Sequence, residues 1–421
     1  MSEVAPPQSS SWKTILSLYL AMMAVGTGQT VVFAVLPMLG REMSLHTLTF
    51  TLPFTDLVIR PGEMAITSLS ALTALVFFLF APLWGRISDR RGRKPIIIVG
   101  LTGYALGTLL FNGVAYLGLV GALGGASLYI LLIVTRAAHA ALMSAAHPAS
   151  SAYMVEITPV HERTKGMARL QAFNQLGSMV GPALAWFVNI SFLAPLYIQA
   201  ALMAVLALLV HRTLPALPVT KPKDGVVSKL SFFDRRFRFY LFVGFAVFSM
   251  LGMVQQTLGF YFQDLLNLDS VKAAQLFSYS MVVSAAAMLV AQFVIVQRFN
   301  GPPETLLKAG LPFSLVGYLI LANAVSLPLL LAGMSLFGFG MGLTAPSYFA
   351  AASLTVDAHE QGGLAGLIGA AAGLGFVTGP LVGGFLYQLS PSYPYWCAAA
   401  IMSALMLVVY LHRRPAACHK V

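Results

Sequence analysis

One cation and two histidines lie on a single face of an apolar segment, residues 127–154. At about 100° per residue in a helix, His139 and His147 fall on the same side as Arg136. A histidine can carry a proton near neutral pH, and an arginine can bind an anionic group. Inserting Arg136 into a membrane costs roughly 2.5 to 3.5 kcal/mol, so it needs a wet or paired environment. We predict that this face borders a polar cavity; the alternative is that Arg136 caps backbone carbonyls while neighbouring helices satisfy the histidines.

Other polar side chains, mostly amides, lie inside further apolar segments. Such groups either bind a substrate or form hydrogen bonds between helices. No Asp or Glu occurs in the middle of an apolar segment, so we expect neutral or anionic substrates rather than cations. The candidate pathway residues outside 127–154 are Gln29, Asn174, Gln255, Gln256, Gln292 and Tyr348.

The stretch from Gly85 to Lys94 concentrates charge between two apolar segments, 64–84 and 95–116. Both segments are about the 20 residues that span a bilayer, so the charged stretch must lie in water or among headgroups. Gly85 and Gly92 permit a tight backbone, and Asp89 can accept hydrogen bonds from a helix N-terminus. We predict a hairpin turn at the membrane surface; the simplest alternative is an ordinary basic loop that only sets topology.

The composition indicates a polytopic membrane protein. Of 421 residues, 58% are hydrophobic and only 9% are charged, far below the roughly 25% charged residues of soluble domains. The net charge of +11 is scattered between apolar segments, which argues against a nucleic-acid partner. The sequence contains no nucleotide-binding loop, metal-ligand cluster or nucleophile elbow, so we predict no enzyme, no metal and no cofactor.

Apolar segments separated by Pro, Gly or charge predict twelve membrane spans. All but four of the 25 Lys and Arg residues fall on one side of them, which predicts cytoplasmic termini. We expect an N-terminal bundle of six helices at 1–212, a cytoplasmic linker at 213–237 and a C-terminal bundle at 238–421. The predicted spans are 13–38, 64–84, 95–116, 127–154, 166–189, 192–212, 238–262, 273–297, 306–326, 328–352, 362–388 and 393–412.

The two halves repeat each other. A shift of 198 residues places Gly177 on Gly375 and Gly181-Pro182 on Gly379-Pro380, and a shift of 226 places Gln29 on Gln255. Parallel repeats with a substrate site between them at mid-membrane are an established transporter architecture. The repeated small-residue pattern predicts a close helix contact followed by a kink.

The ordered spacing Gly-x3-Asp-Arg-x-Gly-Arg-Lys resembles the loop signature between helices 2 and 3 of the major facilitator superfamily. This resemblance implies an all-α membrane fold with twelve transmembrane helices in two pseudo-symmetric six-helix bundles. The segment containing Glu156 and Arg163 resembles the end of helix 4 in that family, which implies that Glu156 pairs with Arg93 in a conformational latch and that Asp89 lies near Gly362. The alternative is an ordinary surface ion pair. The matched positions are Gly85, Asp89, Arg90, Gly92, Arg93 and Lys94.

Two further segments resemble signatures of drug/proton antiporters in this family. Arg136 matches the arginine of the helix 4 signature, although His139 and Ala140 replace its Gln and Gly. Gly181-Pro182 matches the helix 5 signature, whose closing glycines are also replaced.

The resemblance to tetracycline-efflux and multidrug-efflux relatives implies a monomeric, proton-coupled exporter of small organic molecules in a bacterial inner membrane. Its expected partners are the substrate, the proton and the lipid bilayer. The alternatives are an exporter of an anionic metabolite or siderophore-like metallophore, an importer, or a membrane sensor that does not transport.

Overall fold

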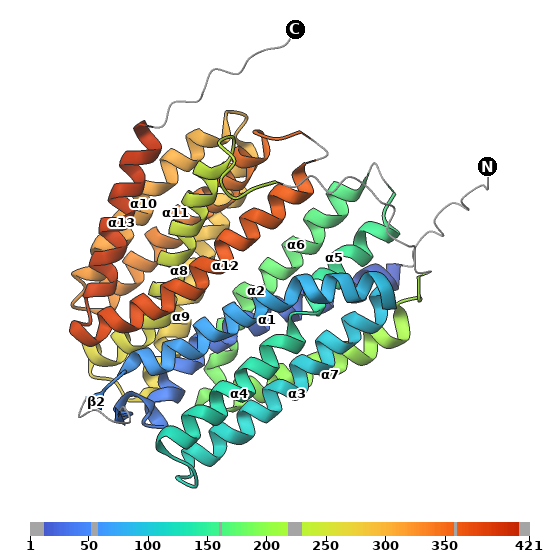
Figure 1. Cartoon of the computed structure of the whole chain (residues 1–421). Helices are drawn as coiled ribbons and strands as arrows, with labels where there is room; N and C mark the ends of the chain where they lie inside the picture. The colour runs from blue at the N-terminus through green and yellow to red at the C-terminus, as the bar shows by residue number, and fades with distance from the viewer. Residues whose placement is uncertain (1–11, 52–57, 160–161, 218–229, 358–359, 412–421) are drawn as a thin grey trace, which may run out of the picture. The chain divides into compact units, whose positions relative to one another are not determined.

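The computed structural model describes residues 12–51, 58–159, 162–217, 230–357 and 360–411 (Figure 1). These residues are almost entirely helical, apart from a short antiparallel pair of strands, β1 (Phe50–Thr51) and β2 (Val58–Ile59). Eleven of the helical stretches among them are long and apolar enough to cross a membrane. Helices suit a bilayer because each satisfies its own backbone hydrogen bonds. The predicted all-α membrane fold is therefore confirmed.

The chain divides into two compact units, which are described separately. Unit 1 comprises Met1–Val226, Leu258–Gln263 and Asn267–Val282. The first boundary between the units falls within the segment 213–237, which was predicted as the linker. Residues 218–229 of this segment lie outside the described part. The helices of the first half are α1 (Trp12–Glu42), η1 (Leu45–Thr47), α2 (Glu63–Arg91), α3 (Arg93–Leu119), α4 (Gly125–Met143), α5 (Ala146–Ile157), α6 (Arg163–Val180), η3 (Gly181–Asn189) and α7 (Ala194–Thr213).

Unit 2 comprises Val227–Thr257, Asp264–Leu266 and Val283–Val421. Within it α10 (Pro303–Ala322) and α11 (Leu327–Ser353) run side by side, and α13 (Tyr393–Leu411) packs against α10 (Figure 1). The helices of the second half are α8 (Arg238–Leu266), α9 (Ser270–Val290), η4 (Ala291–Ile295), η5 (Val296–Arg298), α10 (Pro303–Ala322), α11 (Leu327–Ser353), α12 (Gln361–Leu389) and α13 (Tyr393–Leu411).

Two predicted spans are interrupted in the structure. The segment 127–154 divides into α4 and α5 at Ser144 and Ala145. Pro148 explains the break, because it lacks the N–H that would bond to the Ser144 carbonyl and its ring crowds that carbonyl. The segment 166–189 changes from α-helix to 3-10 helix at Gly181, next to Pro182. That segment is the one predicted span absent from the eleven long, apolar helices among the described residues.

Glycines permit close contacts between helices, and one such contact recurs in both units. A Cβ atom at Gly177 of α6 would collide with the Met23 carbonyl of α1. In unit 2, a Cβ atom at Gly375 of α12 would crowd the backbone of α8 at Ser249. Ser249 lies 226 positions after Met23, and Gly375 lies 198 positions after Gly177. The repeat read from the sequence is therefore matched by a repeated packing contact.

A second recurrence joins α3 to α4 and α10 to α11. A Cβ atom at Gly107 would press on His139, and one at Gly317 would press on the backbone of Phe337. His139 and Phe337 are again 198 positions apart. Both interfaces thus depend on a helix lying close to a neighbour that has no side chain at the contact.

The glycine contacts yield a stability prediction. Alanine is favoured over glycine inside a helix by about 0.5 to 1 kcal/mol, but overpacking at a close contact costs about 1 to 3 kcal/mol. We expect Gly177→Ala to lower the thermal midpoint of the detergent-solubilised protein, measured by fluorescence-detected size exclusion. Gly113→Ala is the matched control, because open space surrounds its Cβ position in α3. A midpoint for Gly177→Ala equal to or above that of the control would contradict the close contact.

Candidate functional site

The charged stretch between α2 and α3 folds into a shorter turn than the sequence predicted. The α2 helix continues to Arg91, and Gly92 alone separates it from α3. Gly92 has φ 90° and ψ 153°, a conformation that favours glycine. Gly85 lies inside α2 with open space around it, so its expected role in the turn is wrong. No helix breaker separates Gly85 from Arg91, and basic residues in a last helical turn complement the helix dipole.

Arg93 joins three helices at this end of unit 1. Its Nε donates to Glu156 Oε1 of α5 over 2.8 Å, and its Nη1 donates to Ser88 Oγ of α2 over 2.6 Å. The same guanidinium forms an ion pair with Asp89, also on α2. Arg93 and Glu156 are 16% and 29% exposed, so protein partly shields the pair from solvent. The pairing that the resemblance implied between these two residues is present.

The remaining residues of the predicted latch differ in exposure. Arg90 is exposed and Lys94 is half-buried. Arg163, at the start of α6, is exposed and forms no ion pair with another described residue. The expected approach of Asp89 to Gly362 would join two different units and stays a prediction.

Arg136 is enclosed within unit 1, between α3 and α4. Arg136 is only 4% exposed. Its guanidinium lies 5.2 Å from the Phe111 ring centre, and its Nη1 lies 3.3 Å from His139 Nδ1. It donates to no carbonyl of the described residues, and its Nε is buried without a partner among them. A cation–π contact returns about 0.5 to 2 kcal/mol, which does not clearly offset an insertion cost of roughly 2.5 to 3.5 kcal/mol. Because Arg136 donates to no carbonyl of the described residues, the alternative in which it caps backbone carbonyls gains no support.

The α3 side of this cluster carries polar residues that the sequence analysis missed. The Tyr104 ring meets the His139 ring edge-on at 4.6 Å. Thr108 and Asn112 are buried, and their side-chain polar atoms have no hydrogen-bond partner among the described residues. The sequence did contain a signal, because the spacing of four places these two polar residues on one face of a mostly apolar helix.

The other candidate residues of unit 1 differ in their surroundings. The His147 side chain of α5 lies near the Gln171 side chain of α6. Asn174 Nδ2 donates to the Met22 carbonyl over 3.1 Å, which is a bond between α6 and α1. Gln29 is half-buried on α1. The interhelical alternative thus describes Asn174 well.

The candidate residues of unit 2 lie on three different elements. Gln255 is half-buried and Gln256 is 1% exposed, both on α8. Gln292 lies in the π-helical turn η4. Tyr348 of α11 is 3% exposed and meets Phe248 at 6.3 Å between ring centres. These positions stay predictions of a substrate pathway.

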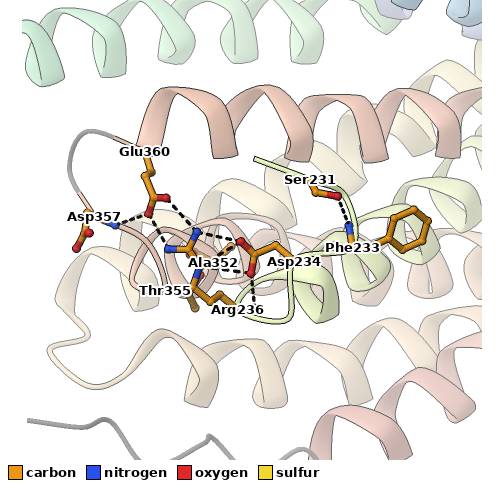
Figure 2. A network of polar contacts seen from close by, with 8 residues as sticks. All are labelled: Ser231, Phe233, Asp234, Arg236, Ala352, Thr355, Asp357 and Glu360. Carbon is orange, nitrogen blue, oxygen red and sulfur yellow. Dashed lines mark hydrogen bonds and ion pairs between the residues drawn. The ribbon is translucent and has the colours of Figure 1, made fainter. Parts of the chain in front are cut away.

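A second ion-pair network holds one end of unit 2 (Figure 2). Arg236 donates from Nη1 and Nη2 to the two carboxylate oxygens of Glu360, over 2.8 and 2.9 Å. Its Nη2 and Nε also bond to Asp234 Oδ2, over 2.9 and 3.1 Å. Glu360 further accepts the backbone N–H of Asp357 over 3.2 Å. Because Glu360 immediately precedes α12, this Arg236 clamp ties the turn before α8 to the start of α12.

The sequence analysis did not single out the Arg236 clamp. The partners are separated by more than a hundred residues, and Asp234 and Arg236 carry no distinctive spacing. A bidentate arginine–carboxylate pair has the geometry that makes a surface ion pair effective. At the position 198 residues before Glu360 stands Glu162, so the repeat places a carboxylate before α6 as well as before α12.

Hydrogen bonds to Arg236 shift the pKa of Asp234. The side-chain bonds from Arg236, followed by its backbone N–H, hold that pKa below the ordinary range. The bonds to Glu360 and Asp234 raise the pKa of Arg236. Asp234 and Arg236 are therefore both charged at neutral pH.

Another polar contact in unit 1 involves Arg41, near the end of α1. Arg41 pairs with Glu63 over 2.8 Å and donates to Gln263 Oε1 over 2.9 Å. Its guanidinium lies 4.8 Å from the Phe260 ring centre. The contact fixes the start of α2 relative to α1 and to the part of α8 that belongs to unit 1.

Comparison with known proteins gives consistent matches. The sequence profile of the Major Facilitator Superfamily matches residues 18–364 and 294–419. The chain is 26% identical to the class H tetracycline resistance protein of Pasteurella multocida, over 82% of this chain and 86% of that protein. It is 22% identical to multidrug resistance protein 1 of Bacillus subtilis strain 168, over 84% and 88% respectively.

Solved structures give the same fold at lower sequence identity. A D-xylose–proton symporter superposes with a TM-score of 0.75 at 14% identity, covering 95% of this chain and 97% of that one. The human organic anion transporter MFSD10 (TETRAN) superposes with a TM-score of 0.65 at 18% identity, covering 94% and 99%.

The Arg93 network predicts that Asp89→Asn slows the transport cycle more than it weakens substrate binding. Loss of one partly shielded ion pair worth about 1 kcal/mol shifts a conformational equilibrium about fivefold. We expect a several-fold loss of transport in proteoliposomes with equilibrium binding retained. Asp269→Asn is the control, since it removes an exposed carboxylate whose pair, with Lys272, is local. Loss of binding with unchanged interhelical distances would show that Asp89 is not part of a latch.

The Arg236 clamp predicts a specific pH dependence. A lowered pKa means that the contribution of Asp234 to stability is complete above the ordinary aspartate pKa of about 3.9 and is lost only as the pH falls through the lowered value. A spin label at Phe232→Cys, with Cys397 and Cys418 replaced by Ser, should keep one electron paramagnetic resonance line shape from neutral pH to mild acid. Asp234→Asn should give a more mobile spectrum, whereas Asp357→Asn, which leaves the clamp side chains intact, should not. Increased mobility in mild acid would contradict the assignment.

Proposed function

The chain belongs to the Major Facilitator Superfamily, and we propose that it is a proton-coupled exporter of small organic molecules that works by alternating access. Membership makes it a membrane transporter rather than an enzyme. The observation that carries the proposal is the Arg93 network, which joins the helix 2–3 signature to Glu156 in unit 1. The named tetracycline and multidrug resistance relatives support the export direction.

The Arg93 network suits a contact that must form and break during each cycle. An ion pair at a partly solvated helix end is worth about 0 to 1 kcal/mol. Such a pair biases two conformations of similar free energy without trapping either of them. A deeply buried pair would be far more costly to open, because each separated charge would lose its partner in a low-dielectric interior.

We propose His139 and His147 as the proton carriers. A coupled transporter needs a group whose charge changes during the cycle, and histidine is the side chain that titrates near neutral pH. His139 contacts Arg136, so a proton on the histidine would repel a neighbouring fixed cation. An anionic substrate near Arg136 would reduce that repulsion. Substrate binding and protonation would then favour each other.

The surroundings of Arg136 also support a second candidate, the export of an anionic metabolite or metallophore. Arg136 is a buried cation whose Nε has no partner among the described residues. Such a group favours a substrate that brings negative charge. A panel of cationic, neutral and anionic compounds, tested in proteoliposomes, separates this candidate from the export of neutral molecules.

The distribution of cations supports a topology with both termini in the cytoplasm and the α2–α3 junction on the same side. Arginine and lysine accumulate on the cytoplasmic side of membrane proteins. A C-terminal fusion to green fluorescent protein should therefore fluoresce, and a C-terminal alkaline phosphatase fusion should be inactive. The reverse pattern would overturn this topology.

We predict that His139→Gln and His147→Gln, alone or together, abolish transport driven by an imposed pH gradient and leave downhill exchange partly intact. Glutamine keeps hydrogen-bonding capacity but cannot carry the proton. His211→Gln is the matched control, because His211 is an exposed histidine in the last turn of α7. Proteoliposomes with a pH gradient, and the same vesicles with only a substrate gradient, measure the two activities.

Three outcomes distinguish the parts of this proposal. Unchanged pH-driven transport in the double variant would exclude histidine coupling. Transport by the native protein that ignores the pH gradient would exclude proton coupling altogether. Absence of transport in both assays, for the whole compound panel, would favour the sensor alternative.

A further inference from the structure

The turn before α8, residues 230–237, presents two aromatic rings to its surroundings. Phe232 is 41% exposed and Phe233 is 85% exposed, whereas Phe237 in the same turn is fully buried. Leaving large apolar rings exposed to water is unfavourable, and exposed apolar groups that gather together commonly mark an interaction surface.

Hydrogen bonds hold this turn in one shape. The backbone N–H of Asp234 donates to the Ser231 carbonyl over 3.1 Å, and the N–H groups of Phe237 and Arg238 donate to the Asp234 carbonyl over 3.3 and 2.9 Å. The Phe233 N–H donates to Ser231 Oγ over 3.3 Å. The Phe233 ring points away from the Arg236 clamp (Figure 2). The rings are thus displayed by a defined turn that is anchored to α12.

The charges of the turn differ in their pairing. Arg236 is engaged by two carboxylates, those of Asp234 and Glu360. Arg235 and Arg238 are exposed and form no ion pair with another residue of the described chain. Two unpaired cations beside two exposed aromatic rings match the chemistry of an anionic membrane surface, where cations meet phosphates and rings enter the headgroup boundary.

We propose that the turn from Leu230 to Arg238 is a binding site for anionic phospholipid. Phe232 and Phe233 insert at the boundary between headgroups and acyl chains, and Arg235 and Arg238 pair with lipid phosphates. Arg236 acts as a positioning residue, because it fixes the turn against Glu360. The membrane is favoured over a soluble protein partner because Arg238 is itself the first residue of α8, a helix long and apolar enough to cross the bilayer. This inference does not depend on the transported substrate.

The test uses the full-length protein in lipid nanodiscs made from phosphatidylcholine with or without phosphatidylglycerol. Cys397 and Cys418 are replaced by Ser, and an environment-sensitive fluorophore is attached at Phe233→Cys. We expect a blue shift when phosphatidylglycerol is added, with quenching by lipids that carry a spin label near the headgroup. Val325→Cys is the control, because Val325 is 76% exposed in a connection without neighbouring cations. Its emission should not depend on the anionic lipid.

The arginines are tested in the same labelled protein. Each of Arg235→Gln and Arg238→Gln should weaken the apparent affinity for phosphatidylglycerol about fivefold, and high salt should weaken it as well. Both changes are at exposed side chains, and unchanged thermal midpoints verify folding. Emission at position 233 that ignores phosphatidylglycerol would overturn the proposal. So would full quenching by aqueous iodide together with protection only when a soluble protein is added.

Discussion

Close helix packing at small residues is the constraint on which the rest of this structure depends. Lipid tails are as apolar as leucine, so membrane helices gain little by burying leucine against leucine and must instead approach closely. Gly177 provides that approach to α1 at Met23, and Gly375 provides it to α8 at Ser249. These contacts recur at the repeat spacing, and the Gly-Pro pair that follows each glycine recurs with them, so the two halves share both a sequence pattern and a packing contact here.

The polar residues Arg136 and His139 do not recur in unit 2. Met334 and Phe337 occupy the positions 198 residues after Arg136 and His139. In unit 2 the corresponding helix pair meets through apolar rings, with Tyr318 and Phe337 at 5.3 Å between ring centres. A buried cation is costly, so its confinement to one repeat is difficult to explain by packing alone. The functional role proposed for Arg136 and His139 would account for this asymmetry.

The sequence predicted the features that depend on composition and local spacing. Hydropathy is sufficient for the membrane class and the helices, and the motif is sufficient to pair Arg93 with Glu156. The extent of α2 was misjudged because Gly85 was read as a turn residue, whereas a glycine with open space around it is compatible with a helix. Which side chains of neighbouring helices face each other was harder still to predict from the sequence. Periodicity placed Arg136 and His139 on one face, but it could not show that this face meets Tyr104 and Phe111 of α3.

The Arg93 network and the Arg236 clamp each join the ends of helices within one unit, but they use different parts of the chain. In unit 1, Glu156 near the end of α5 accepts from Arg93. The position 198 residues later is Leu354, which cannot form an ion pair, so the equivalent contact is absent from unit 2. There the turn before α8 provides Arg236, and the acceptor is Glu360 before α12. The turn before α8 therefore supplies the arginine of the unit 2 network, whereas in unit 1 the arginine comes from the start of α3.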